Sequence, residues 1–231
     1  MKKSLTMALF ATLLMPVASP FLAPAHAHDG DKPMEAKPNE SNVDYFWRKS
    51  DEAFHDGDYP RAIALHKAIV ILDPTEIESY ALGAWLLWSL GKADESNAFI
   101  QQGIEKNPKD SDMWDAAGQH FDLQKRAADS KLAYQKAVEL AGKDADQLLR
   151  RRLAHATEKA GDLGGSIAIW QKLVTDFPDD VVNKNNLARV QELDKAAKKT
   201  NLTSYSAVGG AAIVGIALWR KREAHSHSIG A

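Results

Sequence analysis

The 231-residue sequence contains no cysteine. This absence excludes a disulfide framework, thiol catalysis, zinc sites built on cysteine and a lipid anchor on an acylated cysteine. The chain also lacks an excess of charge of one sign, because 29 basic residues nearly balance 31 acidic ones. No overall positive field therefore indicates a nucleic-acid partner. With 45% hydrophobic and 26% charged residues, the composition is that of a globular protein rather than a disordered one.

The sequence motifs of the common enzyme classes are missing as well. There is no H-E-x-x-H, no G-x-S-x-G, no Walker loop and no G-x-G-x-x-G. The Asp-Gly-Asp sequences at 29–31 and 56–58 do not continue into a calcium loop of about twelve residues. A lone His-x-His at 225–227 is more typical of an incidental pair than of a metal site. We therefore expect no enzyme activity, no cofactor and no bound metal.

The N-terminus has the three parts of a secretory signal in order. Lys2 and Lys3 precede an apolar stretch from Leu5 to about Val17, and Ala25-His26-Ala27 has the A-x-A pattern of a cleavage site. This order predicts a signal peptide over 1–27 and favours export over an uncleaved amphipathic or buried helix. Residues 28–42 carry two prolines and many charges, which predicts a flexible linker.

Near the C-terminus, residues 202–219 contain no charged residue, and three cations follow at 220–222. This pattern predicts a transmembrane helix with a basic cytoplasmic tail at 220–231, which places the chain in a bacterial inner membrane with its main domain in the periplasm or outside. A buried Gly/Ala-rich helix and a sorting tail that is later clipped are alternatives. A small-residue face would let two such helices pack, so a structural homo-oligomer is the alternative function. That face consists of Ala207, Ala211 and Gly215.

The middle of the chain repeats. Pro74 and Pro108 lie 34 residues apart, and Pro178 follows after two further periods plus two residues. A glycine stands 17 residues before each proline, at 57, 91 and 161. Because glycine ends one helix and proline stops the next, this spacing predicts helix–turn–helix units of 34 residues, that is, an all-α repeat solenoid.

With these features the chain resembles the tetratricopeptide repeat family. The units are 43–76, 77–110, 111–144 and 147–180, followed by an amphipathic capping helix over 181–199. The third unit fits the family pattern best, with packing positions at Trp114, Ala117, Gly118, Phe121, Tyr134 and Ala137. The first unit has Lys49 and Ser50 where leucine and glycine are usual, as expected of an end-cap.

The resemblance implies a non-enzymatic scaffold that binds a partner protein or peptide in a concave groove, in the context of envelope complex assembly. The groove positions of the family predict an aromatic half and a basic half: Trp47, Phe54, Trp85 and Trp88, then Arg151, Arg152, His155, Asn186 and Arg189. Alternatively, the two tryptophans at 85 and 88 pack against adjacent units, and the arginines form a solvated helix face. The carboxylate clamp of one subgroup is absent, because Trp47, Asp51 and Leu82 occupy its lysine and asparagine places.

Overall fold

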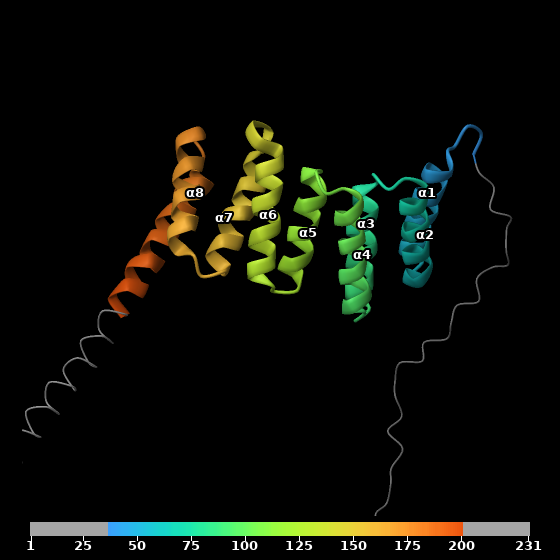
Figure 1. Cartoon of the computed structure of the whole chain (residues 1–231), viewed down its shortest axis with the longest axis horizontal. Helices are drawn as coiled ribbons and strands as arrows, with labels where there is room; N and C mark the ends of the chain where they lie inside the picture. The colour runs from blue at the N-terminus through green and yellow to red at the C-terminus, as the bar shows by residue number, and fades with distance from the viewer. Residues whose placement is uncertain (1–36, 201–231) are drawn as a thin grey trace, which may run out of the picture. The chain divides into compact units, whose positions relative to one another are not determined.

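The computed structural model describes residues 37–200, and within this range all regular structure is helical (Figure 1). The elements are α1 (Asn42–His55), α2 (Tyr59–Leu72), α3 (Ile77–Ser89), α4 (Ala93–Lys106), α5 (Ser111–Leu123), α6 (Ala127–Ala141), the 3₁₀ helix η1 (Gly142–Asp144), α7 (Gln147–Lys159) and α8 (Leu163–Asp176). Residues 181–200 form a further helix, here called the C-terminal helix. The predicted fold class, an all-α helix–turn–helix solenoid, is confirmed.

The helices pack in consecutive pairs, α1 with α2, α3 with α4, α5 with α6 and α7 with α8. Figure 1 shows the pairs following one another in chain order, one pair within each 34-residue period. Three of the tight turns inside the pairs use a glycine with positive φ: Gly57 at 75°, Gly91 at 76° and Gly161 at 85°. The turn between α5 and α6 instead places Lys125 at φ 58°, a backbone conformation that costs an L-residue energy.

The connection between the third and fourth pairs differs from the other two. At the first two junctions a proline follows the helix, and the Asn107 side chain donates a hydrogen bond to the Pro74 carbonyl at 2.8 Å. At the third, Gly142 has a φ of 57° and η1 is inserted before α7 begins. The two extra residues in the sequence period are accommodated here.

The core between the helices is close-packed around large side chains facing small ones. Tyr80, Tyr134 and Trp170 are almost fully buried. A Cβ atom at Gly118 would lie 2.6 Å from the Tyr134 ring, so only glycine allows α5 and α6 to approach this closely. Of the family packing positions in the third unit, four are buried as predicted (Ala117, Gly118, Tyr134 and Ala137). Trp114 and Phe121 are partly buried and pack against the core.

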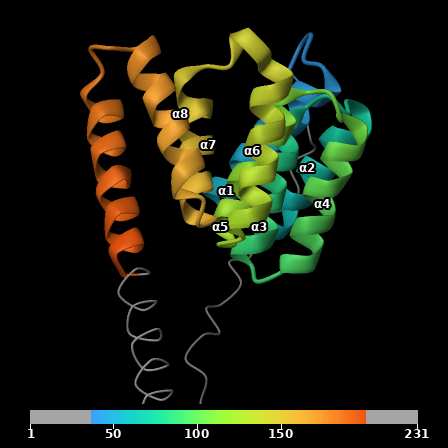
Figure 2. The same cartoon turned by 60° about the vertical axis from the view of Figure 1, so that its left-hand side comes forward.

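The C-terminal helix covers the end of the array. Its Val190 is fully buried in one cluster with Ala154, Trp170 and Leu173, and Leu187 packs against that cluster. In Figure 2 this helix lies beside α8. It therefore acts as the predicted cap on the fourth unit.

Both predicted membrane-directed ends, and most of the linker, fall in 1–36 and 201–231, outside the described residues. In the part that the structure describes, we find no helix with the length and apolar character needed to cross a bilayer. The predicted span at 202–219 and its small-residue face stay predictions.

Candidate functional site

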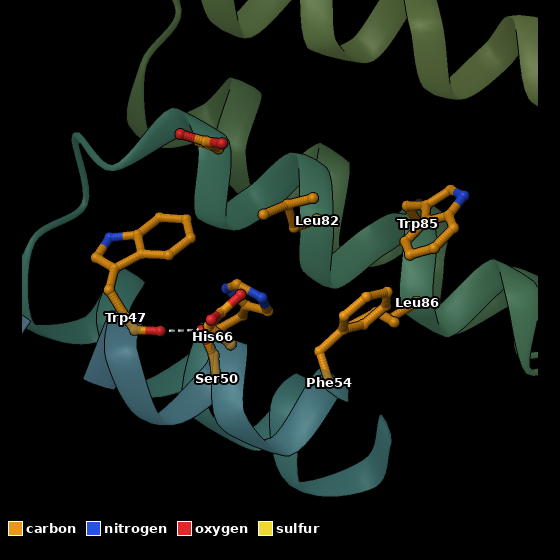
Figure 3. A pocket seen from close by; sticks show the side chains of 9 residues that line it. Trp47, Ser50, Phe54, His66, Leu82, Trp85 and Leu86 are labelled. Atoms are coloured by element: carbon orange, nitrogen blue, oxygen red, sulfur yellow. Dashed lines mark hydrogen bonds between the residues drawn. The ribbon is translucent and has the colours of Figure 1, made fainter. Parts of the chain in front are cut away.

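A cavity of about 310 Å³ opens between α1 and α3, with one residue of α2 at its wall. Figure 3 shows it with Trp47 at one end and Phe54 and Trp85 at the other. The lining residues are Trp47, Ser50, Asp51, Phe54, His66, Glu78, Leu82, Trp85 and Leu86. Positions 47, 51 and 54 share one face of α1, and 78, 82 and 85 share one face of α3, because residues three or four apart are neighbours on a helix. Sequence periodicity thus creates the two walls.

The aromatic walls are partly exposed and held in place by neighbours. The rings of Phe54 and Trp85 lie 6.1 Å apart, and each side chain is 38% exposed. The Trp47 indole N–H donates a hydrogen bond to Glu76 Oε2 at 3.0 Å, which fixes its ring against His66. Aromatic side chains that are partly exposed and held in one orientation are typical of binding surfaces rather than of a hydrophobic core.

His66 forms part of the wall and is neutral. Its Nδ1 lies 2.9 Å from Ser79 Oγ, and burial lowers its pKa to about 4. The charged groups that line the cavity are therefore the carboxylates of Asp51 and Glu78. The cavity combines an apolar interior with a negative border.

A second cavity of about 200 Å³ lies between α3 and α5. It is lined by Ala81, Leu82, Trp85, Ala116, Gln119, His120 and Leu123. Leu82 and Trp85 line both cavities, so the two lie next to each other and together form a groove along α1, α3 and α5. We call this the aromatic groove.

His120, on the α5 side of this groove, is also kept neutral. Its Nε2 lies 2.7 Å from Gln124 Nε2 and 3.2 Å from Asn97 Oδ1. Burial lowers its pKa to about 4, and the nearby Arg126 charge acts in the same direction.

The structure brings three of the four predicted aromatic residues together. Trp47, Phe54 and Trp85 line the first cavity. Trp88, which is 36% exposed, lines neither cavity of the aromatic groove. The two tryptophans of α3 therefore differ in position although they are one turn apart.

The predicted basic residues are engaged within the protein. Each of the three arginines donates to a carboxylate one repeat away: Arg151 to Asp180 (2.5 Å), Arg152 to Asp115, and Arg189 to Glu158 (2.5 and 2.6 Å). We call these contacts the ion-pair ladder; Lys159 and Asp122 extend it at 2.9 Å. The Arg189 guanidinium lowers the pKa of Glu158. The ladder joins α5, α7 and the C-terminal helix and compensates the positive charge expected there.

The two uncharged residues of the predicted basic half are also held internally. His155 packs edge-on against Trp170, with ring centroids 5.0 Å apart, and burial lowers its pKa. The Asn186 side chain donates to the Val182 carbonyl at 2.9 Å. Neither side chain lines the aromatic groove.

Sequence reasoning missed His66 and Glu78 as groove residues. His66 comes from the second helix of its unit, and no sequence signal marks it. The ion-pair ladder could have been predicted from the sequence, because its oppositely charged residues lie 29 to 37 positions apart, about one repeat.

Outside the aromatic groove and the ion-pair ladder, residues 37–200 contain a further cavity and no metal site. No group of three or more His, Asp or Glu side chains there could hold a metal ion. A cavity of about 440 Å³ lies at the irregular third junction, where Val138, Leu153 and Ile169 contribute its apolar lining.

These helix pairs, with a groove along their first helices, define an α-helical repeat protein. A family model described as tetratricopeptide repeat matches residues 53–119. Over those residues the chain is similar to tetratricopeptide repeats, and solved structures show that its fold is similar to theirs. A comparison with curated proteins found no match.

Three solved structures illustrate the similarity. The structure of Naa15/Naa10 bound to HypK-THB is 19% identical with a TM-score of 0.53, and the match covers 69% of this chain but only 24% of that one. The MamA protein is 15% identical with a TM-score of 0.52, covering 68% of this chain and 87% of that one. TPR-like repeats from Podosopora anserina are 10% identical with a TM-score of 0.55, covering 71% and 92%. At these identities the similarity shows the fold alone.

Proposed function

We propose that this protein is a non-enzymatic interaction scaffold that holds a segment of a partner protein in the aromatic groove. One observation carries the proposal: two neighbouring, largely apolar cavities share Leu82 and Trp85 as lining residues, and the aromatic side chains Phe54 and Trp85 there are partly exposed. Exposed aromatic side chains in a concave site supply much of the binding energy of protein interfaces. The repeat fold supports this function, and one structure of similar fold is that of a protein bound to a partner, HypK-THB.

Trp85 and Trp88 provide a matched pair for testing the groove. Both belong to α3 and are exposed to a similar extent, 38% and 36%, but only Trp85 lines the two cavities. In affinity capture with mass spectrometry of the full chain, Trp85→Ala should lose the partner that the unaltered chain retains. Trp88→Ala should keep it. Equal behaviour of the two variants, with circular dichroism showing both folded, would reject the groove as the binding site.

The proposal extends to location on sequence grounds. The signal-like residues 1–27 and the uncharged stretch 202–219 support an exported protein tethered to the bacterial inner membrane, with the repeats on the outer side. Such a tether would place the groove among envelope complexes under assembly. The test is alkaline carbonate extraction of membranes: the full chain should stay in the pellet, and a chain ending at residue 200 should be extracted. Release of both would contradict the tether.

A further inference from the structure

We propose that the aromatic groove selects a segment in which lysine or arginine stands next to a large apolar side chain. This inference rests on the proposed function and names the chemistry of its partner. It predicts that the groove prefers basic segments, whereas a groove lined by free arginines would prefer acidic ones. Three features of the described residues carry it.

The first feature is the shape and lining of the cavity between α1 and α3. Its volume of about 310 Å³ is at the small end of the range for ligand pockets, which is roughly 300–1,000 Å³. The walls are Trp47, Phe54, Leu82, Trp85 and Leu86, so the interior favours an apolar side chain. A cavity of this size accommodates one large side chain and leaves its neighbours in the segment at the border.

The second feature is the pair of carboxylates at that border. Within residues 37–200, the one ion-pair partner of Asp51 is the imidazole of His55, at 3.4 Å, and the Asp51 side chain is 73% exposed. Among the described residues, no lysine or arginine forms an ion pair with Glu78. The cations closest in sequence to Asp51 point elsewhere, because Arg48 and Lys49 both contact Glu52. In the part of the chain that the structure describes, two carboxylates thus border an apolar cavity without a compensating lysine or arginine.

The third feature is the charge of the surrounding helices. Residues 40–110, which contain α1 to α4, hold 13 acidic and seven basic residues, a net charge of −6. Charge of one sign around a site accelerates association with a partner of opposite sign and disfavours like charge. The arginines that would attract an anionic partner are bound in the ion-pair ladder on α7 and the C-terminal helix. An acidic segment would therefore meet repulsion from the carboxylates at the groove.

Selection from a random twelve-residue peptide library displayed on phage, with the immobilised full chain as bait, tests the charge preference directly. The enriched peptides should carry lysine or arginine within two residues of a phenylalanine, leucine, isoleucine or tryptophan. The double variant Asp51→Lys with Glu78→Lys should enrich acidic–apolar peptides instead. A control double variant, Asp94→Lys with Glu105→Lys, makes the same change in net charge on α4, which lines neither cavity of the groove. It should retain the original preference.

Two defined probes then measure the effect. Fluorescein-labelled GSKFLKSG and GSEFLESG differ only in charge, and fluorescence anisotropy should show that the full chain binds the basic one more tightly. Neutralising both carboxylates with Asp51→Asn and Glu78→Gln should weaken the basic probe about three- to tenfold, as expected for two partly exposed ion pairs. Raising the salt concentration should reduce the difference between the probes.

The outcomes separate this inference from the proposed function. Enriched peptides that are apolar, have no charge bias and lose binding in Trp85→Ala would overturn the charge preference and leave the groove in place. Peptides that bind Trp85→Ala unchanged, or no enrichment at all, would overturn both. Enriched acidic peptides would also overturn the inference.

Discussion

Acidification should destabilise the fold through two buried histidines. His66 and His120 are each about 4% exposed, and burial lowers both pKa values to about 4 from 6.5. Between pH 6.5 and 4 the unfolded chain therefore binds protons that the folded chain does not. The contribution of these histidines to the free energy of unfolding is therefore highest above pH 6.5, where they are neutral in both states, and it decreases as the pH falls toward 4.

The size of the effect follows from the two pKa values. Moving from pH 7.5 to pH 5 should reduce the free energy of unfolding by about 2 kcal/mol for each histidine, or about 4 kcal/mol for both. This is a large fraction of the stability of a typical domain, about 5–15 kcal/mol. Carboxylates with lowered pKa values, such as Glu158 and Asp176, change stability in the same direction on acidification. The histidine contribution therefore has to be isolated by substitution.

Urea unfolding of the full chain, followed by circular dichroism at pH 7.5, 6.5, 5.5 and 5, measures the pH dependence. His66→Gln and His120→Gln should each remove about 2 kcal/mol from the difference in stability between pH 7.5 and pH 5. His55→Gln, at a histidine whose side chain is 72% exposed, is the control and should leave the difference unchanged. If the buried-histidine variants lose as much stability on acidification as the unaltered chain, the assignment of neutral buried imidazoles is wrong.

Two further predictions concern backbone and packing. Gly118→Ala should lower the free energy of unfolding by about 1–3 kcal/mol, because its Cβ would lie 2.6 Å from the buried Tyr134 ring. The control Gly164→Ala, in α8, should not lower it, because a Cβ there would have no atom within 4 Å. Equal melting temperatures of the two variants would contradict the close contact at Gly118. Lys125→Gly should raise the free energy of unfolding by up to about 1 kcal/mol, because Lys125 has a φ of 58° where the other pairs have glycine. The variant should therefore unfold at a higher urea concentration, and an unchanged or lower midpoint would argue against strain in this turn.

The repeat architecture could be predicted because its signals are local. Turn glycines and helix-stopping prolines act on their own segment, so their 34-residue spacing translated directly into helix pairs. The one turn without the glycine signal is the one where Lys125 takes the left-handed conformation. The position of this turn between α5 and α6 could be predicted only from the repeat period.

The direction in which a surface side chain points could not be predicted in the same way. Trp85 and Trp88 are equally suited to a groove by residue type and helical position, but only Trp85 lines the cavities. His66 entered the site from the second helix of its unit. These outcomes depend on how neighbouring helices meet, and that information lies in the packing of several units together.

The contacts of the arginines could not be predicted from the sequence either, and these contacts affect function. A cationic side chain on a helix face can meet solvent, a ligand or the next helix, and in this array Arg151, Arg152 and Arg189 meet carboxylates of other helices. An ion pair already formed inside the protein must be broken before either charge can bind a ligand, so it weakens the site as an anion receptor. The aromatic residues of α1 and α3 can bind a ligand without first breaking an ion pair. The carboxylates beside them have no lysine or arginine partner among the described residues. Recognition is therefore expected in the first half of the array, while the charges of the second half hold its helices together.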